Sequence, residues 1–119
     1  MKTVEDILKH LADVIVGMHR RPQMYVGAMT DPGAANMLDM LLSYSYRSWA
    51  YIQERESELS DSQSAVGQRL EFGSRSFSGG YRLLYPNATE SALFLLVLQA
   101  WTEVGERLGF ELREPSPPQ

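Results

Sequence analysis

The feature that most constrains the fold is a run of apolar residues near the C-terminus, "ALFLLVLQAW" (Ala92 to Trp101). From Leu93 to Leu98 every side of a helix would be apolar, so this segment is most stable at the centre of a domain. Asn87 or Thr89 is placed to cap the helix, and Gly109 is expected to end it. The run is about half the ~20 residues that a membrane span requires.

Two amphipathic helices are predicted to pack on different sides of this central helix. Thr3 and Asp6 have the spacing of a capping box, and the helix that they begin is expected to reach about Met18. The Asp-Pro-Gly sequence at Asp31 is a start signal for a second helix, because Asp caps free amides and Pro suits the first helical position. This helix is expected to reach about Glu56.

The second helix divides into two stripes. Its apolar stripe is expected to contain Leu38, Leu41, Leu42, Ser45, Trp49 and Ile52. Its polar stripe is expected to contain Asp39, Ser43, Tyr46, Arg47, Ala50, Gln53 and Glu54. Since Ser45 is small, another helix is predicted to approach closely at that position.

The segment between the second and last helices is ambiguous. Residues 57–64 indicate a solvated connection, because they contain four serines and one large apolar side chain. Beyond them, residues 69–72 and 81–85 fit two short strands, although a helical turn over residues 65–70 fits nearly as well. The prediction is a mainly α, compact single domain over residues 1–114, with three principal helices. A small β-hairpin before the last helix is one alternative, and residues 115–119 are expected to be a disordered tail.

Composition excludes several kinds of site. The chain has no cysteine, so it has neither a disulfide nor a thiolate site, and its net charge of −4 argues against binding to a nucleic-acid backbone. His10 and His19 are the only histidines, and neither belongs to a metal-binding spacing. His19, near the end of the first helix, is expected to be favoured there when protonated. We therefore expect a cytoplasmic protein without metal, cofactor or membrane partner.

The stretch "RRPQMYVG" (Arg20 to Gly27) separates the first two helices. Proline biases the preceding residue away from helical dihedrals, glycine can adopt a positive φ, and the Met-Tyr pair supplies apolar bulk. This pattern predicts a packed structural corner, with a ligand-binding loop as the alternative. The structural residues of this motif are Arg21, Pro22, Met24, Tyr25 and Gly27.

The same stretch resembles the R-P-G-M-Y-I-G segment near the start of the ATPase domain of DNA gyrase B and its relatives, and the likeness extends to about Ala50. In that family the next helix supplies a Glu that activates water and an Asp-Asn pair whose Asn helps to hold magnesium. Counting on from Gly27 brings these positions to Leu41, Tyr44 and Ser45, or one residue later to Leu42, Ser45 and Tyr46. Leucine and tyrosine cannot activate water or supply hard oxygen ligands to Mg²⁺. The likeness therefore implies the loop and helix without the chemistry, and a reduced nucleotide-binding protein or ATPase is the alternative function.

The motif, a long amphipathic helix and a chain of 119 residues are also similar to small stand-alone bacterial immunity proteins. Such proteins neutralise a cognate toxin by binding it, so this resemblance implies a non-catalytic protein whose partner is a protein toxin. Homodimerisation through exposed parts of the helices also remains open.

An acidic run follows the second helix in "QERESELSD" (Gln53 to Asp61). It is either a solvated helix end or an acidic surface presented to a basic partner, whose association would be accelerated by complementary charge. Tyr46 is expected to lie on the polar stripe and to serve as an aromatic anchor for that partner. The predicted partner-binding residues are Tyr46, Glu54, Glu56, Glu58 and Asp61.

Overall fold

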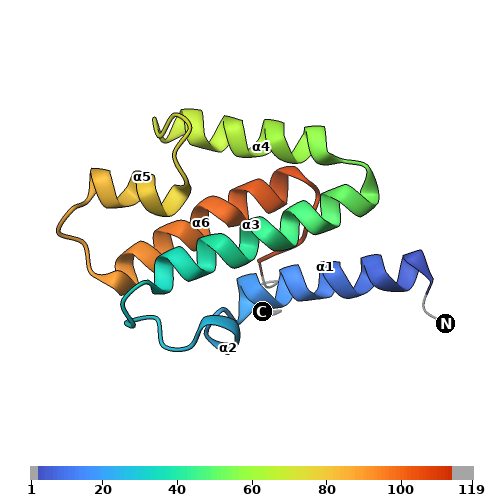
Figure 1. Cartoon of the computed structure of the whole chain (residues 1–119), viewed down its shortest axis with the longest axis horizontal. Helices are drawn as coiled ribbons and strands as arrows, with labels where there is room; N and C mark the ends of the chain where they lie inside the picture. Colours follow the sequence, from blue (N-terminus) through green and yellow to red (C-terminus); the bar gives the residue numbers. More distant parts are fainter. Residues whose placement is uncertain (1–2, 114–119) are drawn as a thin grey trace, which may run out of the picture.

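Six helices make up the residues described by the computed structural model, 3–113 (Figure 1). They are α1 (Val4–Arg20), α2 (Gln23–Val26), α3 (Ala34–Gln53), α4 (Glu56–Arg69), α5 (Phe77–Leu84) and α6 (Glu90–Arg107). The prediction of a mainly α, compact fold is confirmed, but six helices replace the three expected. The predicted tail at residues 115–119 lies outside the described residues. None of the described helices is both long and apolar enough to cross a membrane.

Helix α3 is the centre of the packing. It contacts α1, α2, α4, α5 and α6, and in Figure 1 it lies between α1 and α4 with α6 behind it. The expectation that α1 and α3 would pack on different sides of α6 is wrong, because α1 packs mainly on α3. Ser45 allows this approach, as predicted, and its hydroxyl donates to Met18 Sδ of α1 at 3.6 Å. Helix α6 leaves Leu95 48 % exposed, so it is not buried on every side.

The first and last helices are capped by their own side chains. In α1 the capping box is complete: the Asp6 amide donates to Thr3 Oγ1, and the Thr3 amide donates to Asp6 Oδ2, both at 3.2 Å. At the start of α6, Thr89 rather than Asn87 is the cap, since the Ala92 amide donates to Thr89 Oγ1 at 3.2 Å. These boundaries follow from short local patterns and were predictable.

The first turn of α3 depends on another helix. Its predicted Asp-Pro start is wrong: the helix begins after Gly33, which has a φ of +83° and no side chain to cap the free amides. The Ala35 amide donates instead to Glu90 Oε1 of α6 at 3.1 Å. Arg82 Nη2 lies 2.8 Å from the same oxygen, and its hydrogen bond holds the pKa of Glu90 below its ordinary value. A carboxylate of α6 therefore supplies the cap that the sequence before α3 lacks.

Helices also occupy the region where a hairpin was one alternative. Residues 57–64 lie in α4 instead of a solvated connection, and residues 69–72 and 81–85 form no strand. Helix α4 is polar but buries Leu59 and Val66, two turns apart on one face. Helix α5 is capped by Ser76, whose Oγ accepts from the Gly79 amide at 3.1 Å, and it buries Phe77 and Tyr81. Burial at helical spacing therefore decides against the hairpin.

Gly105 of α6 packs against the hydroxyl end of Tyr46. A methyl group there would collide with the Tyr46 hydroxyl and with Leu112. We expect Gly105→Ala to lower the free energy of unfolding, measured in urea, by about 2 kcal/mol, because the crowded core must shift. Gly67→Ala is the matched control: Gly67 is also buried and helical, but its added methyl would meet only the Gly73 carbonyl at 3.7 Å. It should be neutral or stabilising by up to ~1 kcal/mol, and an equal loss in both variants would contradict the expected collision.

Candidate functional site

Asp39 is a buried carboxylate that joins three helices. Only 6 % of this α3 residue is exposed. Its Oδ2 accepts from the Ser78 amide at 3.0 Å and from the Ser78 hydroxyl at 2.9 Å, both at the start of α5. Its Oδ1 accepts from Trp101 Nε1 of α6 at 2.6 Å. Sequence reasoning placed Asp39 on a solvated stripe and missed this role, since no local pattern pairs it with residues 39 and 62 positions away.

A polar hollow of about 650 Å³ lies beside Asp39, between α3, α4 and the loop before α5. Its lining is rich in hydroxyl groups and includes Ser43, Ser60, Gln63, Ser64, Ser74, Arg75 and Ser76. Arg75 is the one cation in this lining, and its Nη1 donates to the Phe72 carbonyl at 3.4 Å. The Asp39 oxygens already accept three hydrogen bonds, so the hollow offers neutral hydrogen-bonding groups more than a reactive carboxylate.

His19 is held inside the core by two hydroxyl groups. Its Nδ1 lies 3.1 Å from Thr102 Oγ1, and its Nε2 lies 2.8 Å from the Tyr46 hydroxyl. Because Thr102 donates its own proton to the Leu98 carbonyl at 2.7 Å, the Thr102 oxygen accepts from Nδ1–H of the neutral ring. The Tyr46 hydroxyl then donates to Nε2.

The burial of this pair fixes its protonation. Desolvation lowers the pKa of His19 to about 4, and desolvation together with the charge of Glu106 raises the pKa of Tyr46 far above its ordinary value. The expectation that His19 is favoured in its protonated form is therefore wrong. The hydrophobic core removes the ring from water. This desolvation disfavours the protonated ring more than the helix C-terminus favours it.

Tyr46 is not a surface anchor. It is fully buried, stacks on Trp101 with ring centroids 5.5 Å apart, and meets Phe110 edge to face. The predicted stripe is wrong at this position because α3 is surrounded by other helices, so its buried arc also takes in Asp39, Tyr46 and Ala50. The side chain helps to build the core and is not available to a partner.

The predicted acidic residues do lie on the surface, around the turn between α3 and α4. We call Glu54, Glu56, Glu58 and Asp61 the acidic turn; all four are exposed. Glu54 ends α3 in the left-handed conformation, with a φ of +57°. Glu58 accepts from Arg55 at 2.5 Å, and this hydrogen bond lowers the pKa of Glu58. Arg55 is itself held in place, since its guanidinium lies 4.9 Å from the centre of the Trp49 ring.

The R-P-x-M-Y-x-G motif forms the corner between α1 and α3. Arg21 leaves the helical region and ends α1, Pro22 is buried, and Gly27 has a φ of +75°, as these residue types predict. Tyr25 lies against α1, where its hydroxyl would be 2.6 Å from a methyl group added at Gly17. Met24 is 70 % exposed, so the prediction that it seals the corner is wrong.

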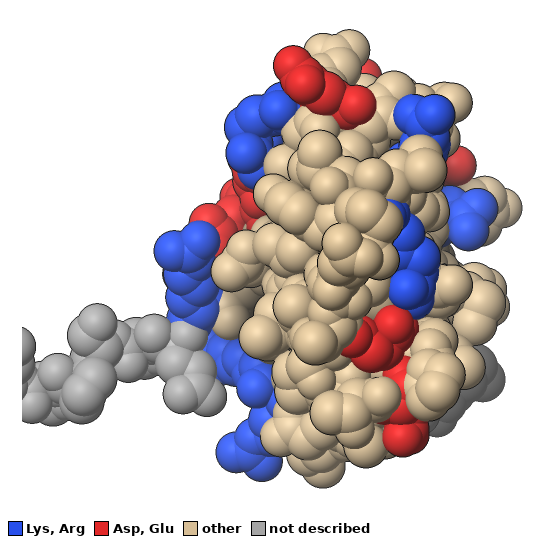
Figure 2. Space-filling model, turned by 90° about the vertical axis from the view of Figure 1, so that its left-hand side faces the viewer, with Lys and Arg blue, Asp and Glu red and all other residues tan. Residues whose placement is uncertain are grey.

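At one end of the molecule, a surface of uncharged residues is bordered by charged side chains. Figure 2 shows it face-on, and uncharged residues cover most of the view. The exposed apolar side chains at the end of α5 are Leu83, Leu84 and Tyr85, at 65 %, 55 % and 47 % exposure. These three residues form an exposed apolar patch at the end of α5.

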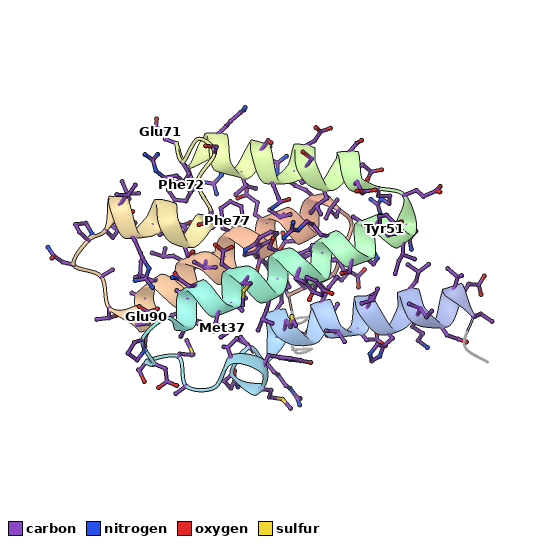
Figure 3. The ribbon with its side chains drawn as sticks, in the orientation of Figure 1. Met37, Tyr51, Glu71, Phe72, Phe77 and Glu90 are labelled. Atoms are coloured by element: carbon purple, nitrogen blue, oxygen red, sulfur yellow. The ribbon has the colours of Figure 1, made fainter. Side chains whose placement is uncertain are left out.

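A second apolar surface runs the length of α3. Met37, Met40, Tyr44 and Tyr51 are 45 %, 60 %, 69 % and 71 % exposed, and Met37 and Tyr51 mark its two ends in Figure 3. Arg47 lies among them and is also exposed. We call these five residues the α3 stripe. This row as a whole was not predicted from the sequence; the spacing of three, four, three and four residues was the available signal.

The stripe borders an open groove between α3 and α4. The groove has a volume of about 1070 Å³, and Tyr44, Arg47, Tyr51, Ile52, Glu56 and Gln63 are among its lining residues. The stripe, the groove and the acidic turn adjoin one another, so this side of the molecule is the best candidate for a binding face. Among residues 3–113, no three His, Asp or Glu side chains cluster as metal ligands would.

No known protein family matches the chain, and neither a curated protein nor a solved structure matches it. Residues 3–113 contain no strand.

Proposed function

We propose that this protein is a non-catalytic, cytoplasmic immunity protein that neutralises a cognate bacterial toxin by protein–protein contact. The contact is made by the acidic turn. The observation that carries the proposal is the exposure of four carboxylates at one corner of the fold, of which Glu58 alone forms an ion pair within residues 3–113.

Carboxylates without intramolecular partners suit recognition of a basic protein surface. Complementary charge accelerates the encounter of two proteins and disfavours partners of the wrong sign. The acidic turn projects from the junction of two helices that are anchored in the core through Trp49, Ala50 and Leu59. This rigid support presents the carboxylates with little loss of conformational entropy on binding.

The buried Asp39 and His19 support a binding role over a catalytic one. Asp39 is occupied by Ser78 and Trp101, and His19 by Tyr46 and Thr102. Both networks are internal, and each ties together helices that are distant in sequence. The residues best suited to acid–base chemistry are thus used to hold the scaffold.

Reversing charge at the acidic turn tests the proposal. Glu56→Lys combined with Asp61→Lys should weaken binding to the product of the neighbouring gene by about 10- to 100-fold in calorimetry, mainly through slower association. The loss should shrink at high salt, because salt screens exposed charges. Both residues are exposed and outside the core, so the thermal unfolding curve should change little.

The matched control is Asp13→Lys combined with Glu111→Lys. It changes the net charge by the same amount at exposed residues of α1 and the C-terminal segment. Its affinity should remain near that of the original protein. If the two double variants bind equally well, the acidic turn is not the contact surface.

A further inference from the structure

The α3 stripe has the spacing of one seam of a coiled coil. Met37, Met40, Tyr44, Arg47 and Tyr51 follow one another at intervals of three, four, three and four residues. On a helix this spacing places all five side chains along one face. Single exposed apolar residues are common on protein surfaces, but a continuous row along 15 residues of one helix is typical of an interaction site.

From the stripe we infer that two copies of this chain pair through it, with their α3 helices antiparallel. The inference does not rest on the proposed function. No segment of residues 3–113 covers the stripe, and in Figure 1 the viewer looks onto α3 between α1 and α4. The partner that covers the stripe is a second copy, because the stripe is complementary to itself.

The complementarity appears when a twofold axis is placed between Ser45 and Tyr46. Tyr44 of each copy then faces Arg47 of the other, and Met40 of each copy faces Tyr51 of the other. An arginine over an aromatic ring and a thioether beside one are both favourable contacts. Because the dimer is symmetric, each of these contacts forms twice.

The alternative parallel arrangement brings like charges together. In that register Arg47 faces Arg47 of the second copy at the centre of the seam, with no carboxylate among the stripe residues to neutralise the pair. The antiparallel register separates the two guanidinium groups and gives each an aromatic partner. Charge therefore selects the orientation, as it does for coiled coils in general.

Sedimentation velocity on the full chain tests the pairing. We expect a reversible dimer with a dissociation constant of about 10 µM, as suits a small, partly polar interface. Tyr44→Arg should weaken it by about 10- to 100-fold, because two Arg–Tyr contacts become two Arg–Arg contacts. Tyr44→Arg combined with Arg47→Tyr should restore it, since the exchange rebuilds both contacts only in the antiparallel register.

Leu84→Ser is the control, because it removes a side chain of similar exposure, 55 %, from the patch on α5. It should leave the dissociation constant unchanged. The inference is overturned if the original protein stays monomeric up to about 0.2 mM, a concentration well above the expected dissociation constant. It is also overturned if Tyr44→Arg dimerises normally, if the exchanged double variant fails to recover, or if Leu84→Ser abolishes the dimer. These outcomes require no toxin, so they are independent of the test of the proposed function.

Discussion

Replacing Asp39 with alanine is expected to lower the free energy of unfolding by about 4 kcal/mol, because buried donors lose their acceptor. The Ser78 amide and the Trp101 indole N–H both point to this carboxylate, at 3.0 Å and 2.6 Å. Both donor residues are buried, since Ser78 is 7 % exposed and Trp101 2 % exposed. Urea unfolding followed by circular dichroism measures the change.

Two further variants separate this effect from simple loss of packing. Ser78→Ala removes one donor and leaves the carboxylate in place, so it should cost only about 1 kcal/mol. Trp101→Phe removes the indole N–H, and Asp39→Ala should cost less in that background than in the original protein. If Asp39→Ala costs no more than Ser78→Ala, or if the two sites show no coupling, the carboxylate does not hold these helices together.

The free energy of unfolding is expected to fall by about 3 kcal/mol between pH 6.5 and pH 4 because of His19 alone. The folded protein holds this ring neutral, with a pKa lowered to about 4 from an ordinary 6.5. Between these two values the unfolded chain binds a proton that the folded chain does not, so acidification favours unfolding. The slope should flatten below about pH 4, where both states are protonated.

His19→Gln isolates this contribution from that of the carboxylates. Glutamine does not titrate and offers both a donor and an acceptor, but it lacks the ring that meets Tyr46 edge to face at 5.8 Å. The variant should be less stable at pH 7 by about 2 kcal/mol. This difference should disappear near pH 5, and by pH 4 the variant should be the more stable protein by about 1 kcal/mol. A difference that stays constant from pH 7 to pH 4 would show that His19 does not titrate as its burial requires.

How far sequence predicts this fold depends on how local the determining interactions are. The capping box of Thr3 and Asp6 and the ends of α1 and α6 were predicted, because each is set by residues within one turn. Most of helix α4 was not predicted, although a helical turn over residues 65–70 was one alternative. Its polar sequence resembles a loop, and Leu59 and Val66 are its only large apolar side chains buried against α3 and α6. The start of α3 failed for the same reason, because its cap comes from Glu90, 55 residues away from Ala35.

For the candidate site, the sequence predicted which charged residues are exposed but not which aromatic residues are. Glu54, Glu56 and Asp61 are exposed as expected, because charged residues rarely enter a core unpaired. Tyr46 was assigned to the polar side of α3 because the prediction assumed that only one helix packs against α3. Other helices also pack against it and bury further positions, including Tyr46. Exposed Tyr44, two residues earlier on the opposite side of α3, is the aromatic residue that the surface offers.

The two carboxylates that reach from one helix to the amino end of another also determine how the molecule can open. Glu90 of α6 completes the start of α3, and Asp39 of α3 completes the start of α5. Fraying at the beginning of α6 therefore loosens α3, and disturbing α3 loosens α5 in turn. We therefore expect hydrogen exchange at the starts of α3, α5 and α6 to be coupled, because these two carboxylates link the three helices.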